Sequence, residues 1–327
     1  MKNHQGKIRY IERIGKSTPI LIPSFSSKGF PHVKDLHNYL KHKLTEASLV
    51  STYDLHYGNL EIDQIYESDI IFVDSGGYER NREHDVSDIY GTLHFPKEWN
   101  VSLYEEQASK LKSITDIVLI NYDYQEPLPM EVQLNRARVN FEKFPDFASD
   151  FLCKPTSNEE SLINVNDVVQ NVNLLAPFDI LGFTEKELGH SILERANNIY
   201  RIRKALTDAG LDKPIHIFGC LDPLSVVLFF LCGADIFDGL SWLRFSFKNG
   251  IPVYMNHYSI SNGYWNKHEN EVKVLGFSEN LCELSQLKYR LEKFLRSSDW
   301  DDIGVSEHDL KQLMVILEQI GKHKSNE

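Results

Sequence analysis

The sequence has few cysteines, and none of them is spaced like a metal ligand. Its four cysteines, Cys153, Cys220, Cys232 and Cys282, are widely separated, and no two form a CxxC motif. Three of them lie in apolar stretches, which favours buried free thiols over disulfides. The cysteines therefore predict no zinc site, no other metal site and no disulfide framework, and they fit a reducing cytoplasm.

Other absences narrow the class of protein further. The N-terminal sequence MKNHQGKIRY lacks the apolar stretch of a signal peptide, and the longest apolar run, residues 224–232, is too short to cross a bilayer. No GxGxxG motif follows an early strand, which argues against dinucleotide binding, and we expect no cofactor. The net charge of −12 argues against a protein that coats nucleic acid by bulk electrostatics, although it allows a local basic groove. We therefore expect a cytoplasmic protein without a membrane segment.

Eight short β-rich stretches alternate with segments of helical periodicity. Most of the stretches are apolar throughout, which is typical of parallel strands covered on both faces. They cover residues 19–24, 47–53, 70–74, 116–123, 150–154, 178–183, 214–219 and 234–240. Ser191 followed by Glu194 resembles a capping box at the start of one helix. Eight such alternations predict a (β/α)8 TIM barrel rather than an open doubly wound sheet.

The pattern changes after Arg244. Residues 251–260 look like an extra strand or hairpin arm, and Asn262-Gly263 is a turn signal. Two amphipathic helices follow. The apolar face of the first consists of Leu287, Leu291, Phe294 and Leu295. The second has Ser306 as its N-cap, and its apolar face consists of Leu310, Leu313, Leu317 and Ile320. We therefore divide the chain into a barrel domain, residues 1–262, and a C-terminal helical extension, residues 263–327, that packs on the barrel.

Aspartates stand where parallel barrel strands end, the place that carries catalytic groups in this fold. Asp74 ends the third predicted strand, Asp123 the fourth and Asp238 lies in the eighth, while Gly182 and Gly219 close the sixth and seventh. An aspartate at the end of a buried strand is costly to place there for packing alone. Carboxylates suit a base whose edge offers N–H donors, such as guanine. Two carboxylates at close range also suit cleavage of a glycosidic bond, one as nucleophile and one as proton carrier.

Each of these residues also has a structural interpretation. Asp238 could cap a turn or pair with Arg244, and Asp74 could form an Asx-turn before two glycines. Asp123 could simply begin a polar loop, and Trp242 could stack on a base or pack in the core. For Asp238, the position at the end of a strand favours a catalytic role. For Asp74, a catalytic role is favoured because Asp238 supplies a second carboxylate. For Asp123 and Trp242 both interpretations remain open.

Several motifs between residues 18 and 245 match one family in their order along the chain. They are Thr18-Pro19 through Pro23, Ser51-Thr52-Tyr53-Asp54-Leu55, Asp74-Ser75-Gly76-Gly77-Tyr78, Asn121-Tyr122-Asp123, Pro214 through Gly219, and Gly233-Ala234-Asp235-Ile236-Phe237-Asp238 with Arg244 six residues on. Each motif alone is weak, but the ordered set is specific. The chain resembles the tRNA-guanine transglycosylases and their relatives that insert 7-deazaguanines into DNA.

The resemblance implies a pentosyltransferase that exchanges guanine in DNA or tRNA for a free 7-deazaguanine base. In that family's terms Asp238 would be the nucleophile of a covalent ribosyl-enzyme, Asp74 would handle the proton of the departing and incoming bases, and Asp123 would read the amino edge of the base. The further substrate-binding positions would be Ser75, Gly76, Gly182 and Gly219, with Arg244 on a backbone phosphate.

The chain departs from the family pattern at several positions. The C-terminal zinc site of the tRNA enzymes, a CxCxxC cluster with a distant histidine, has no counterpart here. A glutamine that reads the base is missing near Lys154, the family's double glycine is reduced to Gly182-Phe183, and Glu79 replaces another glutamine. The altered pocket predicts a change in the base accepted, and the missing zinc module favours a DNA-type or otherwise divergent substrate.

Two other classes of function remain open at this point. A hydrolase acting on a free nucleoside or nucleotide would share the first step, with water taking the second. A non-catalytic accessory subunit would keep the barrel and bind only a partner protein or nucleic acid, although it would have no need of both Asp74 and Asp238. The sequence leaves open whether the polymer is DNA or tRNA, which deazaguanine enters, and whether the chain forms a homodimer or needs a partner.

Overall fold

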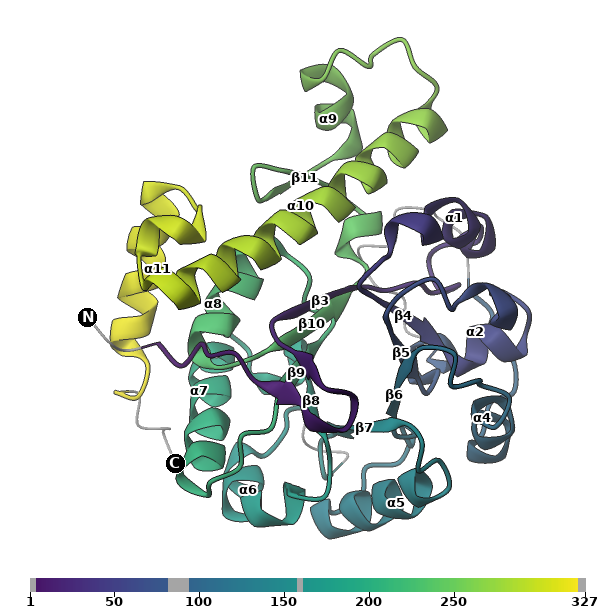
Figure 1. Cartoon of the computed structure of the whole chain (residues 1–327), viewed down its shortest axis with the longest axis vertical. Coiled ribbons are helices and arrows are strands. Elements are labelled where there is room, and N and C mark those ends of the chain that lie inside the picture. Colours follow the sequence, from purple (N-terminus) through teal and green to yellow (C-terminus); the bar gives the residue numbers. More distant parts are fainter. Residues whose placement is uncertain (1–3, 82–93, 158–160, 323–327) are drawn as a thin grey trace.

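Eight parallel strands form a barrel surrounded by helices in the computed structural model, which describes residues 4–81, 94–157 and 161–322 (Figure 1). The strands are β3 (Ile20–Pro23), β4 (Ala47–Ser51), β5 (Ile70–Asp74), β6 (Asp116–Ile120), β7 (Ala148–Cys153), β8 (Ile180–Thr184), β9 (Ile215–Phe218) and β10 (Ile236–Gly239). Each strand from β4 to β10 pairs with its neighbours in the chain, β10 pairs with β3, and a bridge between Ser24 and Leu49 joins the ends of the sheet. The predicted (β/α)8 fold and all eight predicted strands are confirmed.

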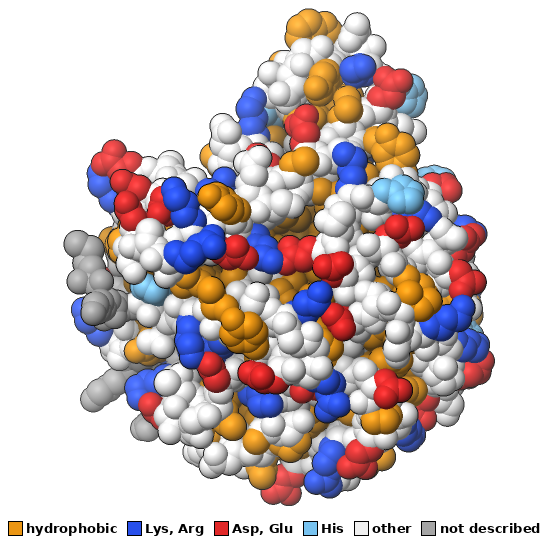
Figure 2. Space-filling view, viewed as in Figure 1, with side chains coloured by type: hydrophobic (Ala, Val, Ile, Leu, Met, Phe, Trp, Pro, Cys, Tyr) orange, Lys and Arg blue, Asp and Glu red, His pale blue; other side chains and the backbone are white. Residues whose placement is uncertain are grey.

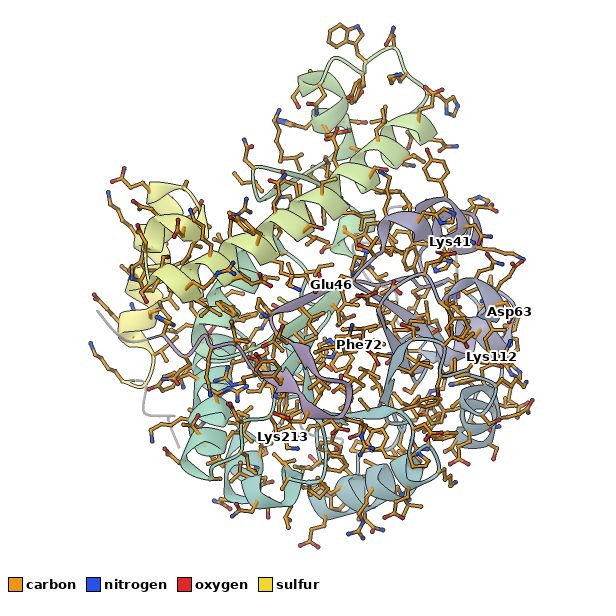
Figure 3. The ribbon with its side chains drawn as sticks, viewed as in Figure 1. Lys41, Glu46, Asp63, Phe72, Lys112 and Lys213 are labelled. Atoms are coloured by element: carbon orange, nitrogen blue, oxygen red, sulfur yellow. The ribbon has the colours of Figure 1, made fainter. Side chains whose placement is uncertain are left out.

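Side chains alternate between two apolar layers along every strand, as a period of two requires. Ile20, Phe72 and Ile236 belong to a cluster inside the barrel, and Phe72 lies within the ring of strands in Figure 3. Leu21 and Phe237 belong to a second cluster, between the strands and the helices. The strands read as continuous apolar runs because both of their faces are covered.

The barrel helices follow the strands in the expected alternation. They are α1 (Val33–Leu40), α2 (Thr52–His56), α3 (Gly77–Arg80), α4 (Val101–Ala108), α5 (Met130–Glu142), α6 (Val165–Gln170), α7 (Ile192–Asp208) and α8 (Pro223–Cys232). The predicted capping box is present at the start of α7, where Ser191 accepts a hydrogen bond from the backbone of Glu194 and the Glu194 side chain returns one. None of the helices among the described residues is long and apolar enough to cross a bilayer.

A small hairpin covers the N-terminal end of the barrel. It consists of β1 (Tyr10–Ile11) and β2 (Lys16–Ser17), which lie in front of the ring of strands in Figure 1. Ile11 is fully buried in the same cluster as Ile20 and Ile236. On this side of the molecule acidic and basic side chains are interspersed (Figure 2). The carboxyl ends of the strands, where a site is expected, face the opposite way.

The segment after Arg244 differs in part from its prediction. An antiparallel hairpin of β11 (Ser246–Lys248) and β12 (Ile251–Val253) accounts for the beginning of the predicted arm, but α9 (Met255–Ser261) replaces its remainder. The extended prediction is wrong there because Met255 and Tyr258, one turn apart, pack against Gly276 of the next helix.

The two predicted closing helices are present. The first, α10 (Glu269–Ser297), begins well before its leucine-rich face, packs against β3 and α8, and extends with α9 beyond the barrel in Figure 1. The second, α11 (Glu307–Gln319), opens on the predicted N-cap, whose hydroxyl accepts a hydrogen bond from the backbone of Asp309. Trp242, left open by the sequence, packs in the core: it is fully buried and its indole donates to the carbonyl of Ser24.

Candidate functional site

Four polar side chains point into the barrel among apolar neighbours. Each of them lies two residues along its strand from an apolar residue of the inner cluster, and therefore on the same face of the strand. The four pairs are Asp74 with Phe72, Asp150 with Ala148, His216 with Phe218, and Asp238 with Ile236. Burial of polar groups inside an apolar barrel is costly unless they are hydrogen-bonded. The contacts of these four side chains therefore define the candidate site.

Asp238 is buried and surrounded by donors. Its Oδ2 accepts a hydrogen bond from the hydroxyl of Ser24 at 2.7 Å, and its Oδ1 accepts one from the backbone N–H of Gly219 at 3.0 Å. The Nε2 of His216 lies 3.4 Å from the same Oδ1. Hydrogen bonds to a carboxylate stabilise its charged form, which is the form a nucleophile requires.

Asp74 forms an Asx-turn at the carboxyl end of β5. Its Oδ2 accepts a hydrogen bond from the N–H of Gly76 at 2.9 Å, and Gly76 takes a left-handed backbone with φ of 83°. Burial raises the pKa of Asp74 to about 6, and the nearby charges of Asp123 and Asp238 add to the increase. The turn holds the carboxyl in place, while its surroundings bring its pKa close to neutrality, where a proton carrier is most effective.

Asp123 is held against the loop that follows Asp74. Its backbone N–H donates to the hydroxyl of Ser75 at 3.1 Å, and a Cβ on Gly77 would lie only 2.6 Å from its Oδ2. The Nζ of Lys154 lies 3.8 Å from that oxygen. Asp74, Ser75 and Asp123 therefore form one unit, in which Gly77 allows the close approach of the third carboxylate.

The two predicted glycines lie in different surroundings. A Cβ on Gly182 would come within 2.4 Å of the Phe218 ring, so that ring fills the space the glycine leaves. Gly219 has φ of 77°, no atom lies within 4 Å of the position its Cβ would take, and its N–H points to Asp238. Gly219 thus lies beside the site at an open position, whereas Gly182 makes room for Phe218.

Substitution of Gly182 by Ala tests this packing. The new methyl group meets Phe218 and Asp150, and such overpacking typically costs about 1–3 kcal/mol of unfolding free energy. We expect the double variant Gly182→Ala/Phe218→Leu to lose less stability than the sum of the two single variants, measured by urea denaturation. Additive losses would show that the Phe218 ring is not fixed over Gly182.

Cations lie around the mouth of the site. Arg244, in the turn after β10, donates from Nη2 to the hydroxyl of Tyr78 at 3.3 Å. Lys28 donates to the backbone carbonyl of Tyr78, and its ammonium lies 4.3 Å from the centre of that ring. Arg80 donates to the Tyr122 hydroxyl at 2.7 Å and to the Asp123 carbonyl at 2.8 Å. These positive groups surround the loop that carries Asp74.

Glu79, which stands where the resemblance has a glutamine, is buried under this loop. Its Oε1 accepts a hydrogen bond from the hydroxyl of Ser26. Burial raises the pKa of Glu79 well above its usual range, and the charges of Asp54 and Asp74 raise it further. A protonated carboxyl offers one donor and one acceptor, much as an amide does. The raised pKa of Glu79 therefore favours the form of the carboxyl that resembles an amide in its hydrogen bonds.

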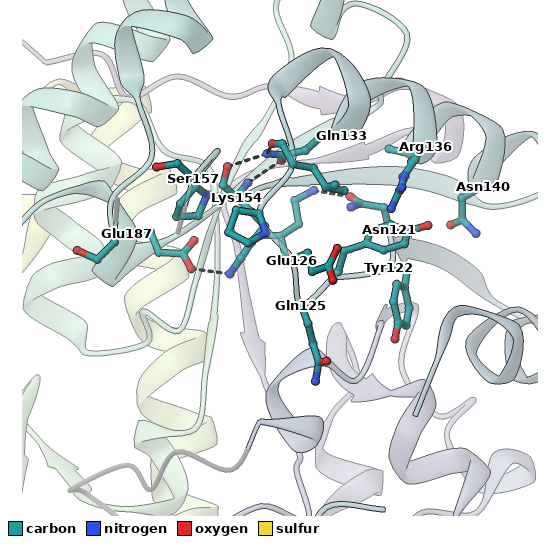
Figure 4. Close-up of a pocket in the computed structure, with 17 residues that line it drawn as sticks. Asn121, Tyr122, Gln125, Glu126, Gln133, Arg136, Asn140, Lys154, Ser157 and Glu187 are labelled. Atoms are coloured by element: carbon teal, nitrogen blue, oxygen red, sulfur yellow. Dashed lines mark hydrogen bonds and ion pairs between the residues drawn. The ribbon is translucent and has the colours of Figure 1, made fainter. Parts of the chain in front are cut away.

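A cavity of about 420 Å³ opens at the ends of β6 and β7, next to Asp123 (Figure 4). Lys154 is its central cation, with Nζ 2.5 Å from Glu187 and its backbone N–H donating to Gln133. Burial lowers the pKa of Lys154, but Asp123 and Glu187 outweigh that effect and raise it. Other polar lining residues include Asn121, Tyr122, Tyr124, Gln125, Glu126, Arg136 and Ser157, and apolar side chains such as Leu128 and Leu152 also line it. The cavity is polar and charged, and Lys154 connects it to Asp123.

Four residues of the site were not predicted from the sequence: Asp150, His216, Glu187 and, in its pairing, Lys154. Asp150 and His216 carried a usable signal, because each is a polar residue at an inward position of an apolar strand. Glu187 carried none, since it lies in a short turn after β8 and meets Lys154 only through the fold. Within the described ranges no three His, Cys, Asp or Glu side chains are grouped to hold a metal ion.

Comparison with known proteins adds no further similarity, since neither a family model nor a curated protein matches this chain.

Proposed function

We propose that this protein is a base-exchange transglycosylase, which replaces guanine in DNA or tRNA by a free 7-deazaguanine. The observation that carries the proposal is the pair Asp74 and Asp238. Asp238 is surrounded by hydrogen-bond donors, whereas Asp74 has its pKa raised to about 6 by burial and by the neighbouring aspartates. Two carboxyl groups with such different surroundings have the character of a nucleophile and a proton carrier.

In the first step a carboxylate oxygen of Asp238 attacks C1′ of a flipped-out guanosine nucleotide. A C1′–O bond forms, the C1′–N9 bond breaks, and its electron pair leaves with guanine. Protonated Asp74 gives its proton to the departing base. The products are neutral guanine, an ionised Asp74 and a ribosyl or deoxyribosyl ester of Asp238.

In the second step N9 of the incoming 7-deazaguanine attacks C1′ of the ester. The new C1′–N9 bond forms, the ester bond breaks with its electrons returning to Asp238, and the N9 proton passes to Asp74. Two inversions give net retention at C1′. Asp123 would read the amino edge of the base, with the cavity around Lys154 beside it, and Arg244 would hold a backbone phosphate.

Exchange of labelled guanine tests the proposal directly. The protein is incubated with radiolabelled guanine and, separately, with a tRNA pool and a duplex DNA pool. We expect the labelled guanine to be incorporated into one of the two pools, and we expect no incorporation with the Asp238→Asn variant. Release of guanine without incorporation of label or of any deazaguanine would instead show a hydrolase. Label in neither pool would contradict the transglycosylase, and retained biological activity in Asp238→Ala would favour an accessory subunit.

The pKa of Asp74 predicts opposite pH dependences for the two steps. The first step needs protonated Asp74, so the rate of covalent-complex formation should fall as the pH rises through about 6. The second step needs ionised Asp74, so the rate at which an isolated complex accepts labelled base should rise through the same pH. Both rates are measured in single turnover, the first as protein shifted on a denaturing gel. Two parallel profiles would exclude Asp74 as the shared proton carrier.

A further inference from the structure

Three side chains from three strands form a row across the barrel interior. His216 on β9 is fully buried between Asp150 on β7 and Asp238 on β10. Its Nδ1 lies 2.6 Å from Oδ2 of Asp150, and its Nε2 lies 3.4 Å from Oδ1 of Asp238. Phe218, with its ring centre 3.9 Å away, and Phe72 at 5.5 Å flank the imidazole. The ring is therefore fixed between two carboxyl groups and shielded by aromatic rings.

The surroundings of His216 favour its charged form. Burial alone would lower its pKa, but the charges of Asp150 and Asp238, with the hydrogen bond to Asp150, outweigh this and raise the pKa to about 9. An imidazolium is a donor at both nitrogens, which matches a carboxylate on each side. Burial also raises the pKa of Asp150, and the imidazolium opposes that rise, so the two charges depend on each other.

The oxygens of Asp238 are not equivalent. Oδ1 faces both the Gly219 N–H and the His216 ring, whereas Oδ2 accepts a hydrogen bond from the Ser24 hydroxyl. Asp238 shares the site with Asp74, and two nearby carboxylates resist being ionised together. A positive charge beside one member of such a pair determines which of the two keeps the proton.

We propose that Asp150 and His216 are positioning residues. Asp150 holds the ring of His216, as an imidazolium, against Oδ1 of Asp238. Asp238 is then the ionised carboxylate of the pair, and Asp74 carries the proton. Oδ2 is then the oxygen that attacks C1′. This inference rests on the proposed function for its catalytic consequence, but not for the charge state of His216. After the ester forms, the imidazolium remains paired with Asp150, and the buried row changes from a net charge of −1 to zero.

The charge state of His216 is measured without any assay of activity. In protein labelled with ¹⁵N-histidine, we expect the His216 ring nitrogens to show the shifts of an imidazolium at pH 7 and to titrate only near pH 9. The His216→Gln variant assigns the signal by its loss. In Asp150→Asn, which keeps the shape but removes one charge, the titration should move toward lower pH. A neutral His216 at pH 7 in the wild type would overturn the proposal.

The catalytic consequence is measured in the exchange assay with the same variants. We expect Asp150→Asn and His216→Gln to lower kcat by about 10²-fold with little change in KM, because the nucleophile and not the substrate contacts is altered. The charged and titratable groups facing His216 are Asp150 and Asp238, with Phe72 and Phe218 covering the ring.

His37→Gln is the matched control, because it replaces a buried histidine of a different kind. Its ring packs on Phe25, and burial, with the charge of Lys41, lowers its pKa to about 4, so it is neutral in the working range. We expect no change in kcat or in the pH profile for this variant. Unchanged kinetics in folded Asp150→Asn, beside an inactive Asp238→Asn, would overturn the positioning role. An active Asp238→Asn would refute the proposed function instead, while the histidine titration would still decide the charge of His216.

Discussion

Replacement of Asp238 by Asn is expected to abolish base exchange, with a loss in kcat of more than about 10³-fold, because an amide oxygen does not form the covalent ester. The shape of the side chain is unchanged. With its amide oxygen in the place of Oδ1, the asparagine still accepts the N–H of Gly219, and its NH2 group donates to the hydroxyl of Ser24, which can also accept. The fold should therefore survive. The measurement is label exchange together with a denaturing gel, on which the shifted covalent complex should disappear.

Asp116→Asn is the control for this variant. Asp116 begins β6, at the opposite end of the barrel, and its carboxylate lies 3.5 Å from Lys16 in a partly exposed ion pair. The same chemical change there should leave exchange unaltered, because the residue is remote from the mouth. If Asp238→Asn retained more than about a tenth of the wild-type rate, Asp238 would not be the nucleophile.

Replacement of Asp235 by Ala is expected to cost about 3–5 kcal/mol of unfolding free energy, the largest stability effect we predict. Asp235 is fully buried just before β10, and its carboxylate accepts hydrogen bonds from Arg203 at 2.5 Å, Arg9 at 2.8 Å and the N–H of Ile215 at 2.8 Å. Burial lowers the pKa of Arg203 to about 10 in spite of the attraction of Asp235. Without this carboxylate, two buried guanidinium groups would lose their shared partner, and only the exposed Asp212, at the Nε of Arg9, would remain to compensate their charge.

The exposed neighbour Asp212 provides the comparison. Its side chain is 57% exposed and contacts Lys7 at 2.6 Å and the Nε of Arg9 at 3.1 Å. Such a pair is screened by water, so Asp212→Ala should cost less than about 1 kcal/mol. Urea denaturation of both variants measures the difference. Equal losses would mean that the buried cluster around Asp235 contributes no more than a surface pair.

Much of the fold was predictable because its signals are local. The eight strands are short apolar runs between turn residues, and the starts of α7 and α11 carry Ser191 and Ser306 at the predicted capping positions. The same locality explains the error after β12. Residues 255–260 look extended by themselves, but contacts of Met255 and Tyr258 with Gly276 on α10 select a helix.

The candidate site was predictable only in outline. Asp74, Asp123 and Asp238 each follow or end a strand, and parallel strands bring such positions to one mouth, so topology alone placed them together. The structure adds the side-chain contacts around these aspartates. Phe218 covers Gly182, Lys154 pairs with Glu187, and neither contact leaves a pattern in the sequence.

The barrel, the end of it that carries the aspartates, and the order in which these residues occur along the chain could all be predicted from the amino-acid sequence. Those properties follow from strand period, turn residues and chain connectivity, which are all local. The electrostatics of the site depend instead on contacts between distant parts of the chain. Asp150, His216 and Asp238 come from three strands, and each pKa depends on distances of a few ångströms and on burial, which exist only after the barrel closes.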